Sequence, residues 1–186
     1  MLAEIGILLL LVLANGFFAG AEMAVVAVRK ARLATLVDER RRGARAVAAL
    51  RQAPEQFLAT VQIGVTVVGA TAAAFGGATI AARLTPLLAE IPPLARYAQD
   101  LAIGVVVALV SFLSLVLGEL VPKSLALRSP EPVALAVGRP LRALSLLAQP
   151  LVWLLTKSSN LVLASATARQ VRRVRVTSPP RPATAE

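Results

Sequence analysis

The sequence contains no cysteine and no histidine, and aromatic residues make up only 4% of its 186 positions. Without cysteine there is neither a disulfide framework nor thiol chemistry. Zinc sites built on these two residue types are excluded, and so is acid–base catalysis by histidine. Because no nucleophile–base pair or phosphate-binding loop is visible either, we do not expect an enzyme.

The chain instead has long apolar runs. Hydrophobic residues make up 57% of it, the mean hydropathy is +0.73, and Ala, Leu and Val dominate, as in packed membrane helices. A helix needs about 20 residues to cross a bilayer, and three runs are long enough. The sequence therefore predicts an all-α, multi-pass protein of the cell membrane, with the lipid bilayer as its surroundings. The predicted spans cover residues of about 4–28, 56–82 and 100–122.

The distribution of charge predicts the orientation. The formal net charge is +10, and the basic residues lie in clusters that flank the predicted spans. Nucleic-acid binding is not expected, because the positive-inside rule already explains these clusters. No Lys or Arg precedes Arg29, so the first run is a retained span and not a signal peptide. We expect the N-terminus outside and the C-terminus in the cytoplasm.

A strongly basic segment separates the first two spans. Residues 29–51 carry eight basic and two acidic side chains, a net charge of +6, which places them in the cytoplasm. Apolar residues within the segment recur at helical spacing. We expect two amphipathic juxtamembrane helices in about 30–51, divided near Gly43.

The apolar region of about 132–168 follows the third span. A single crossing here would put the arginines after it on the outside, against the positive-inside rule. Pro140 and Pro150 also divide the region into pieces too short to span comfortably. We therefore expect juxtamembrane helices that lie along the cytoplasmic face or dip into it. Residues 169–186 form a basic and then Pro-rich tail, and its Pro-rich part, 177–186, is expected to be a linker or a cut end.

The third span ends in a turn that can offer oxygen ligands. Glu119 lies in an apolar segment, where a charge costs roughly 2.5–3.5 kcal/mol, and this makes it a functional candidate. Pro122 cannot donate a backbone N–H toward residue 118, and Gly118 has no side chain to shield its carbonyl. A bare carbonyl and a carboxylate together suit Mg2+. The alternative is that Glu119 lies at the membrane surface and pairs with Lys123.

The other two spans carry polar residues at a compatible depth. Asn15 and Glu22 share a face of the first span, and Gln62 and Thr66 share a face of the second. We expect their oxygens to converge with the turn of the third span on a cation in the inner half of the bilayer. The alternative is a face that serves helix packing only. Because three helices cannot easily enclose a pathway, we expect a twofold homodimer. The predicted ion ligands are Asn15, Glu22, Gln62, Thr66, Ser114, Gly118 and Glu119.

Three motifs match a known family in order and spacing. They are NGFFAGAEMA at 15–24, FLATVQIGVT at 57–66 and LGELVPK at 117–123. Together they resemble the transmembrane domain of the CNNM/CorC proteins, also called the hemolysin-C-like family, over residues 1–168. The resemblance implies a homodimer with three spans and a juxtamembrane belt in each chain. It also implies outward Mg2+ transport coupled to Na+, with the Gly118–Glu119 turn and Glu22 at the family's motif positions.

The chain departs from that family pattern at several positions. Ala19 and Ala21 stand where many relatives have serine, and Val65 stands where many have asparagine. Either Gln62 and Thr66 bind the ion in place of those serine and asparagine side chains, or the substrate is another cation. A branch with this Gln-Ile-Gly-x-Thr pattern is linked to export of polyamines such as putrescine and cadaverine.

Two further expectations concern the role and the size of the chain. A function of a different class is a membrane anchor or scaffold without transport. Members of the resembled family usually continue into a CBS-domain pair, which binds nucleotide and regulates transport. That regulatory partner is expected in full-length relatives and is absent from these 186 residues.

Overall fold

The computed structural model describes residues 2–177, and it describes their side chains as far as position 161 and at position 163. Every regular element in that part of the chain is a helix, which confirms the predicted all-α class. Of the predicted tail, residues 178–186 and the side chains of 169–177 lie outside the described part. The chain divides into two compact units, Met1–Leu147 and Ala148–Glu186.

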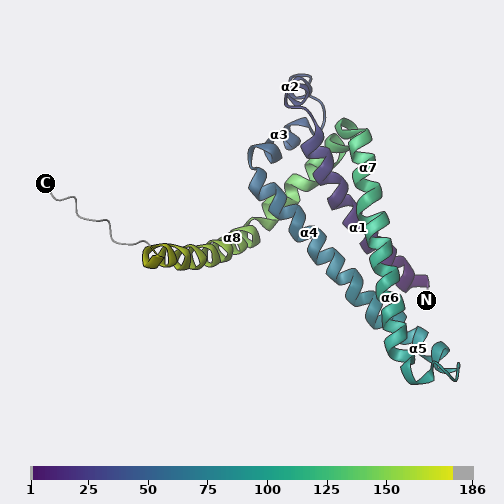
Figure 1. The fold of residues 1–186 in the computed structure, drawn as a ribbon. Coiled ribbons are helices and arrows are strands. Elements are labelled where there is room, and N and C mark those ends of the chain that lie inside the picture. The colour runs from purple at the N-terminus through teal and green to yellow at the C-terminus, as the bar shows by residue number, and fades with distance from the viewer. Residues whose placement is uncertain (1, 178–186) are drawn as a thin grey trace. The chain divides into compact units, whose positions relative to one another are not determined.

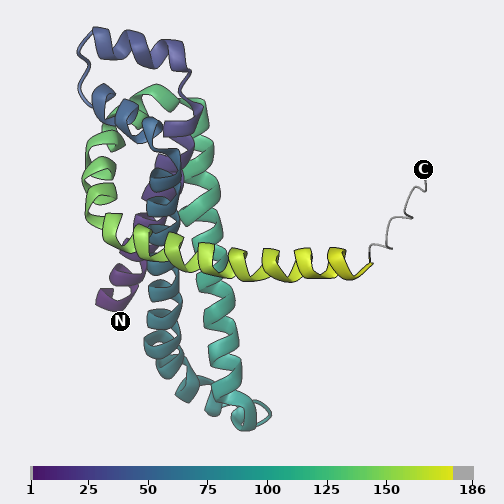
Figure 2. The ribbon, with the colours of Figure 1, turned by 90° about the vertical axis from the view of Figure 1, so that its left-hand side faces the viewer.

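Three long apolar helical segments run side by side in the first unit (Figures 1 and 2). Within the described residues, each is long and apolar enough to cross a membrane, as the sequence predicts. The first span is α1 (Leu2–Ala27). The second consists of α4 (Pro54–Phe75), the π-helical turn η1 (Gly76–Ile80) and α5 (Ala81–Ala89). The third consists of the 3-10 turn η2 (Ala95–Tyr97), α6 (Ala98–Leu115), the π-helical turn η3 (Val116–Leu120) and α7 (Val121–Arg128).

The second and third spans are each interrupted by a π-helical turn. Such turns are rare in proteins, and those that occur are often found at functional sites. In η1, Gly76 is buried against α6, where an added Cβ would lie 2.9 Å from Val110 Cγ2. The second turn, η3, ends two residues before Pro122, and the N–H of Val121 bonds to the carbonyl of Val116. The π-helical register therefore ends where proline interrupts the supply of backbone donors.

A juxtamembrane belt packs against the end of the spans where α1 ends and α4 begins (Figure 1). It consists of α2 (Lys30–Asp38), α3 (Ala44–Gln52) and the first part of α8 (Pro130–Thr177). The helix pair predicted on either side of Gly43 is present. Val47 and Leu141 are fully buried in a core that also contains Phe57 of α4. Burying a side chain of this size stabilises the fold by about 1.5–3 kcal/mol.

Gly43 fixes the turn between α2 and α3. Its φ of +89° lies in the left-handed region, which glycine adopts without steric cost. The residue also lies against α8, because an added Cβ would overlap the carbonyl of Leu135. Gly138 of α8 faces back in the same way, with an added Cβ 2.7 Å from Val47 Cγ2. The two segments therefore meet at backbone contact distance.

The structure differs from the sequence-based expectation over residues 132–168. Pro140 and Pro150 were expected to divide this region, but one helix runs through both as α8. Each proline is exposed, and so are Ala136 and Leu146, the residues whose carbonyls lose a helical donor. Because these carbonyls lie on the open face of the helix, they can turn outward to other donors, and the helix continues.

The described part of the second unit continues α8 as an exposed helix. Most of its large apolar side chains are exposed, among them Leu151 and Leu161. Trp153 is exposed as well, and the ammonium of Lys157 lies 4.6 Å from the centre of its ring. Such an amphipathic pair is typical of a membrane–water interface.

Candidate functional site

The first and third spans are joined by a buried hydrogen bond at mid-helix. Asn15 of α1 is only 6% exposed, and its Nδ2 donates to the carbonyl oxygen of Gly118 in η3 over 3.1 Å. Pro122 has no N–H to offer this carbonyl from the following turn. The side-chain amide therefore supplies a donor at the position where the backbone of the third span cannot.

Glycines allow the two spans to approach this closely. A Cβ added at Gly16 would lie 2.9 Å from Pro122 Cγ and 3.0 Å from the carbonyl oxygen of Leu117. One added at Gly20 would lie 3.3 Å from Pro122 Cβ. On the other helix, an added Cβ at Gly118 would meet Asn15 Nδ2 at 3.1 Å. Small residues at a helix crossing in lipid have this effect, because they let backbone meet backbone.

The other polar atom of Asn15 is left without a partner. Its Oδ1 is buried and accepts no hydrogen bond from any described group. It faces α4, where a Cβ added at Gly69 would lie 4.0 Å from it. An unsatisfied buried acceptor costs about 1–3 kcal/mol, and each such atom in a folded protein requires an explanation. A bound cation or water at this position would satisfy it.

Glu119 lies in η3 one residue after the Asn15 contact. Its carboxylate accepts a 2.6 Å hydrogen bond from Lys123 Nζ, and its side chain is 42% exposed. The ion pair of Glu119 with Lys123, which the sequence offered as the alternative to a cation site, is therefore present in the structure. The same turn presents the Gly118 carbonyl inward to α1 and the Glu119 carboxylate toward Lys123.

The remaining predicted ligands lie on the expected helices, and no hydrogen bond or ion pair among the described residues joins them to Glu119. Glu22 is half-buried on α1 and makes no ion pair or hydrogen bond with the described groups. Gln62 and Thr66 are exposed on α4, and Ser114 is half-buried on α6. No group of three or more acidic, histidine or cysteine side chains lies together in the part of the chain that the structure describes. Of the predicted set, the structure joins Asn15 to Gly118.

Two features of this region were not predicted from the sequence. The first is the contact of Gly16 and Gly20 with Pro122. These glycines are four positions apart, which is the small-xxx-small pattern of close helix pairs, so a signal was available. The second is the η3 turn itself. A kink at Pro122 was expected, but a π-helical turn has no distinct local sequence signal.

Comparison with known proteins places these features among relatives. The sequence profile of the family described as "Cyclin M transmembrane N-terminal domain" matches residues 5–177. A UPF0053 protein of Synechocystis is 44% identical over 160 residues, which are 86% of this chain and 36% of that protein. The UPF0053 protein YhdT of Bacillus subtilis is 31% identical over 85% of this chain and 34% of its own length. A protein of Salmonella typhimurium named "Polyamine export protein" is 29% identical over 96% of this chain and 40% of its own length. The chain thus spans little more than a third of the length of these relatives.

Proposed function

Because this chain belongs to the Cyclin M transmembrane N-terminal domain family, we propose that it transports Mg2+ or a related divalent cation across the cell membrane. The observation that carries this proposal is the unpaired Oδ1 of Asn15, buried inside a bundle of membrane-spanning helices. An amide oxygen without a donor in a low-dielectric interior is a ready cation ligand. Polar and ionisable groups at that depth are costly, and they commonly mark an ion pathway.

The η3 turn supplies the second part of the proposed site. Mg2+ prefers about six oxygen ligands and releases its waters reluctantly, so a few protein oxygens and several waters suffice. Asn15 Oδ1 and the Gly118 carbonyl are the inner oxygens, and the Glu119 carboxylate provides the negative charge. For Glu119 to approach the ion, its carboxylate must exchange Lys123 for the cation. Glu22, Gln62, Thr66 and Ser114 complete the proposed path along the three spans.

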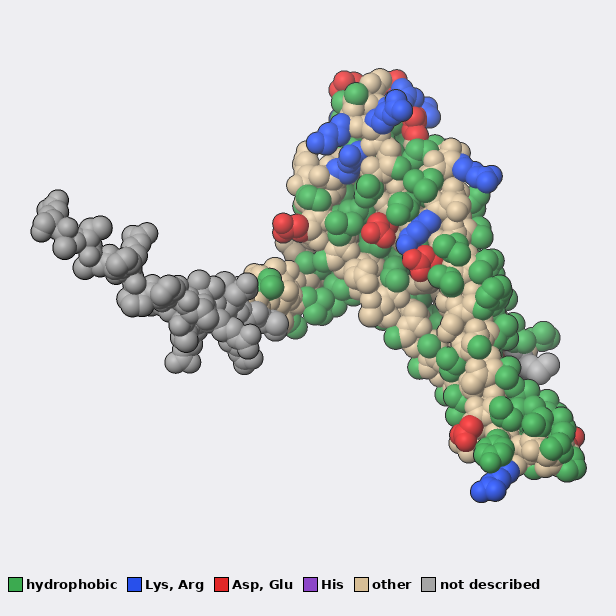
Figure 3. Space-filling view, in the orientation of Figure 1, with side chains coloured by type: hydrophobic (Ala, Val, Ile, Leu, Met, Phe, Trp, Pro, Cys, Tyr) green, Lys and Arg blue, Asp and Glu red, His purple; other side chains and the backbone are tan. Residues whose placement is uncertain are grey.

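The charge distribution supports the orientation within this proposal. Lys and Arg gather at the α2–α3 end of the first unit, and few lie at the α5 end (Figure 3). By the positive-inside rule the α2–α3 end faces the cytoplasm and the N-terminus lies outside. With this orientation Glu119 lies toward the cytoplasmic end, and we propose outward transport with Na+ as the coupling ion, which the family resemblance implies.

The exposed polar face of α4 supports a homodimer. Gln62 and Thr66 are exposed in a single protomer, within a helix that is long and apolar enough to lie in lipid. Such residues rarely face lipid and usually face a helix bundle or a water-filled cavity. A second copy related by twofold symmetry would cover them and enclose the path. A CBS-domain pair, expected in the longer relatives, is the proposed regulatory partner.

Flux through proteoliposomes tests the role of Glu119. We expect Glu119→Gln to lower Mg2+ efflux tenfold or more and to abolish the rise in melting temperature that Mg2+ causes in detergent. Lys123→Gln keeps the carboxylate and should retain both responses, and Glu90→Gln at the opposite end of the spans is the charge-matched control. If Glu119 serves only its ion pair, the exchange Glu119→Lys with Lys123→Glu will behave as the wild type. A scaffold without transport will show no Mg2+ response in any variant.

Polyamine export is a second candidate function. A relative that aligns with 96% of this chain at 29% identity is named a polyamine export protein. Glu22 is a half-buried carboxylate without an ion-pair partner among the described residues, which suits an ammonium group at one end of a diamine. Proteoliposomes loaded with putrescine and with Mg2+ separate the two. Efflux of putrescine that is insensitive to Mg2+ and lost in Glu22→Gln would favour the polyamine.

A further inference from the structure

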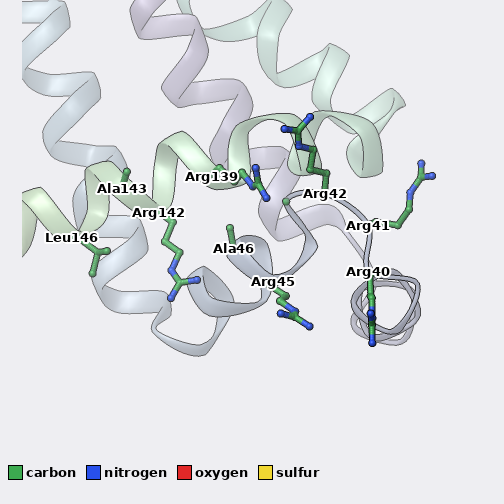
Figure 4. Close-up of a pocket in the computed structure, with 10 residues that line it drawn as sticks. Arg40, Arg41, Arg42, Arg45, Ala46, Arg139, Arg142, Ala143 and Leu146 are labelled. Carbon is green, nitrogen blue, oxygen red and sulfur yellow. The ribbon is translucent and has the colours of Figure 1, made fainter.

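Six arginines from three segments surround one open cavity in the juxtamembrane belt (Figure 4). The cavity has a volume of about 750 Å³. Three of the arginines lie in the turn between α2 and α3, one lies at the start of α3, and two lie on α8. We call this set the arginine pocket, and its members are Arg40, Arg41, Arg42, Arg45, Arg139 and Arg142.

Among the described residues, no ion pair neutralises the charge of the arginine pocket. None of the six makes an ion pair with a carboxylate in the part that the structure describes. Two of the nearby acids are engaged elsewhere, because Arg32 pairs with Glu131 at 2.8 Å and with Glu39 at 3.8 Å. Asp38 makes no ion pair with the described residues. Arg41 adds to the effect of Arg32 in lowering the pKa of Glu131 but forms no ion pair with it. Like charges held together repel one another. An anion that enters the cavity relieves this repulsion and gains charge-assisted hydrogen bonds.

The backbone holds the arginines of the two segments next to each other. At Gly43 and Gly138 the α2–α3 turn and α8 approach so closely that an added Cβ would overlap the other segment or press against it. Arg40 adopts a φ of +54°, a left-handed conformation that is unfavourable for a non-glycine residue. The pocket is therefore built into the packed belt and does not depend on flexible arginines alone.

The lining of the pocket also has an apolar side. Ala46, Ala143 and Leu146 line it beside the arginines, and Leu146 is 59% exposed. An adjoining cavity of about 710 Å³ shares four of the arginines and adds Leu135 and Pro140. A free inorganic anion would use only the guanidinium groups. A molecule with an anionic head and an apolar chain would use both surfaces.

We propose that the arginine pocket binds the phosphate headgroup of an anionic phospholipid, with the start of its acyl chain along Leu146. Guanidinium groups match phosphate oxygens in paired hydrogen bonds. Clusters of four to eight basic residues at the membrane edge attract anionic lipids electrostatically. The belt lies at the end of the spans, where headgroups are within reach. This site is separate from Asn15 and Glu119 and does not depend on which substrate they bind.

Binding of a short-chain lipid to the purified chain tests the proposal. The chain is kept in a neutral detergent, and its melting temperature is followed against dihexanoyl phosphatidylglycerol, dihexanoyl phosphatidylcholine and inorganic phosphate. We expect stabilisation by phosphatidylglycerol at concentrations where the other two have little effect. In Arg45→Gln/Arg142→Gln the apparent affinity for phosphatidylglycerol should fall tenfold or more. The control Arg96→Gln/Lys157→Gln removes two charges elsewhere and should respond as the wild type.

Four results would overturn this proposal. Equal responses to phosphatidylglycerol and phosphatidylcholine would show that the protein responds to the acyl chains alone. A response to inorganic phosphate equal to that to phosphatidylglycerol would show a site for free anions. An affinity that falls equally in both double variants would show attraction by net charge without a site. If Arg45→Gln/Arg142→Gln does not fold, the salt dependence of lipid binding by the wild-type protein tests the proposal instead. Its response to phosphatidylglycerol should weaken strongly between low salt and about 1 M salt, and a salt-independent response would contradict the proposal.

Discussion

Asn15 and Gly118 are 103 positions apart in the chain and are joined by one buried hydrogen bond. The bond ties the middle of α1 to the π-helical turn that precedes Pro122. It uses one polar atom of the asparagine and leaves the other, Oδ1, buried without a partner. The same residue thus supports the helix packing and offers the acceptor on which the proposed ion site depends.

Replacement of Asn15 should therefore affect stability and ion binding separately. Asn15→Ala removes the donor to the Gly118 carbonyl and should lower the free energy of unfolding by about 1–2 kcal/mol. It should also abolish stabilisation by Mg2+. Thr71→Ala removes a hydroxyl that bonds only to the carbonyl of Val67 in its own exposed turn, and it should change neither quantity appreciably.

Equilibrium unfolding in detergent, with and without Mg2+, measures both effects of Asn15→Ala. The assignment of Oδ1 as a ligand would fail if Asn15→Ala bound Mg2+ as the wild type does. A variant that lost stability but kept its Mg2+ response would leave Asn15 with a packing role alone.

Two glycines in spanning helices should respond in opposite ways to one added methyl group. Gly16→Ala places a Cβ 2.9 Å from Pro122 Cγ and 3.0 Å from a backbone carbonyl, so α1 and α7 must separate. We expect a loss of about 1–3 kcal/mol. Gly104 of α6 has nothing within 4 Å of an added Cβ, and Gly104→Ala should be neutral or stabilise by up to about 1 kcal/mol through helix propensity.

Unfolding curves of the two alanine variants in the same detergent compare these effects directly. If Gly16→Ala were as stable as Gly104→Ala, the close contact of α1 with Pro122 would not exist in the protein. Destabilisation by Gly104→Ala alone would indicate a contact of α6 with a second copy of the chain.

An ion pair in the belt should give the stability a dependence on pH. Hydrogen bonds from Arg32, at 2.9 and 2.8 Å, hold the pKa of Glu131 below its ordinary value of 4.5. A carboxyl group whose pKa is lowered on folding stabilises the fold above its unfolded pKa. That contribution disappears as the pH falls through the folded pKa. We expect Glu131→Gln to melt at a lower temperature than the wild type at pH 7, and the difference to vanish at acid pH.

Melting temperatures recorded from pH 7 down to about pH 3 test this prediction. Glu55→Gln is the control, since Glu55 is exposed and makes no ion pair with the described residues, and its curve should run parallel to that of the wild type. A constant difference between Glu131→Gln and the wild type over the whole range would show that the pair does not contribute through its charge.

Several features of the fold could be predicted because they depend on local patterns. Apolar runs of bilayer length gave the three spans, and helical spacing with Gly43 between two segments gave α2 and α3. The i, i+4 spacing of Glu119 and Lys123 allowed their ion pair as the alternative to an ion ligand. In the structure that pair forms at 2.6 Å, because such a contact needs only one helix turn.

Other features depend on how helices meet, and no local pattern contains that information. Pro140 and Pro150 were expected to end helices. Both prolines are exposed on α8, and so are the residues four positions before them, whose carbonyls lose a donor. The arginines of the α2–α3 turn were assigned to a basic loop, and their meeting with Arg139 and Arg142 follows from the close approach at Gly43 and Gly138.

The sequence by itself determined that this chain crosses a membrane as three helices with a basic belt, because burial of apolar length in lipid is set by composition and run length. Only the tertiary structure decided which polar groups meet. The register in which α1 packs against η3 brings Asn15 to the Gly118 carbonyl. That register depends on glycine contacts with Pro122, more than a hundred positions away in the chain.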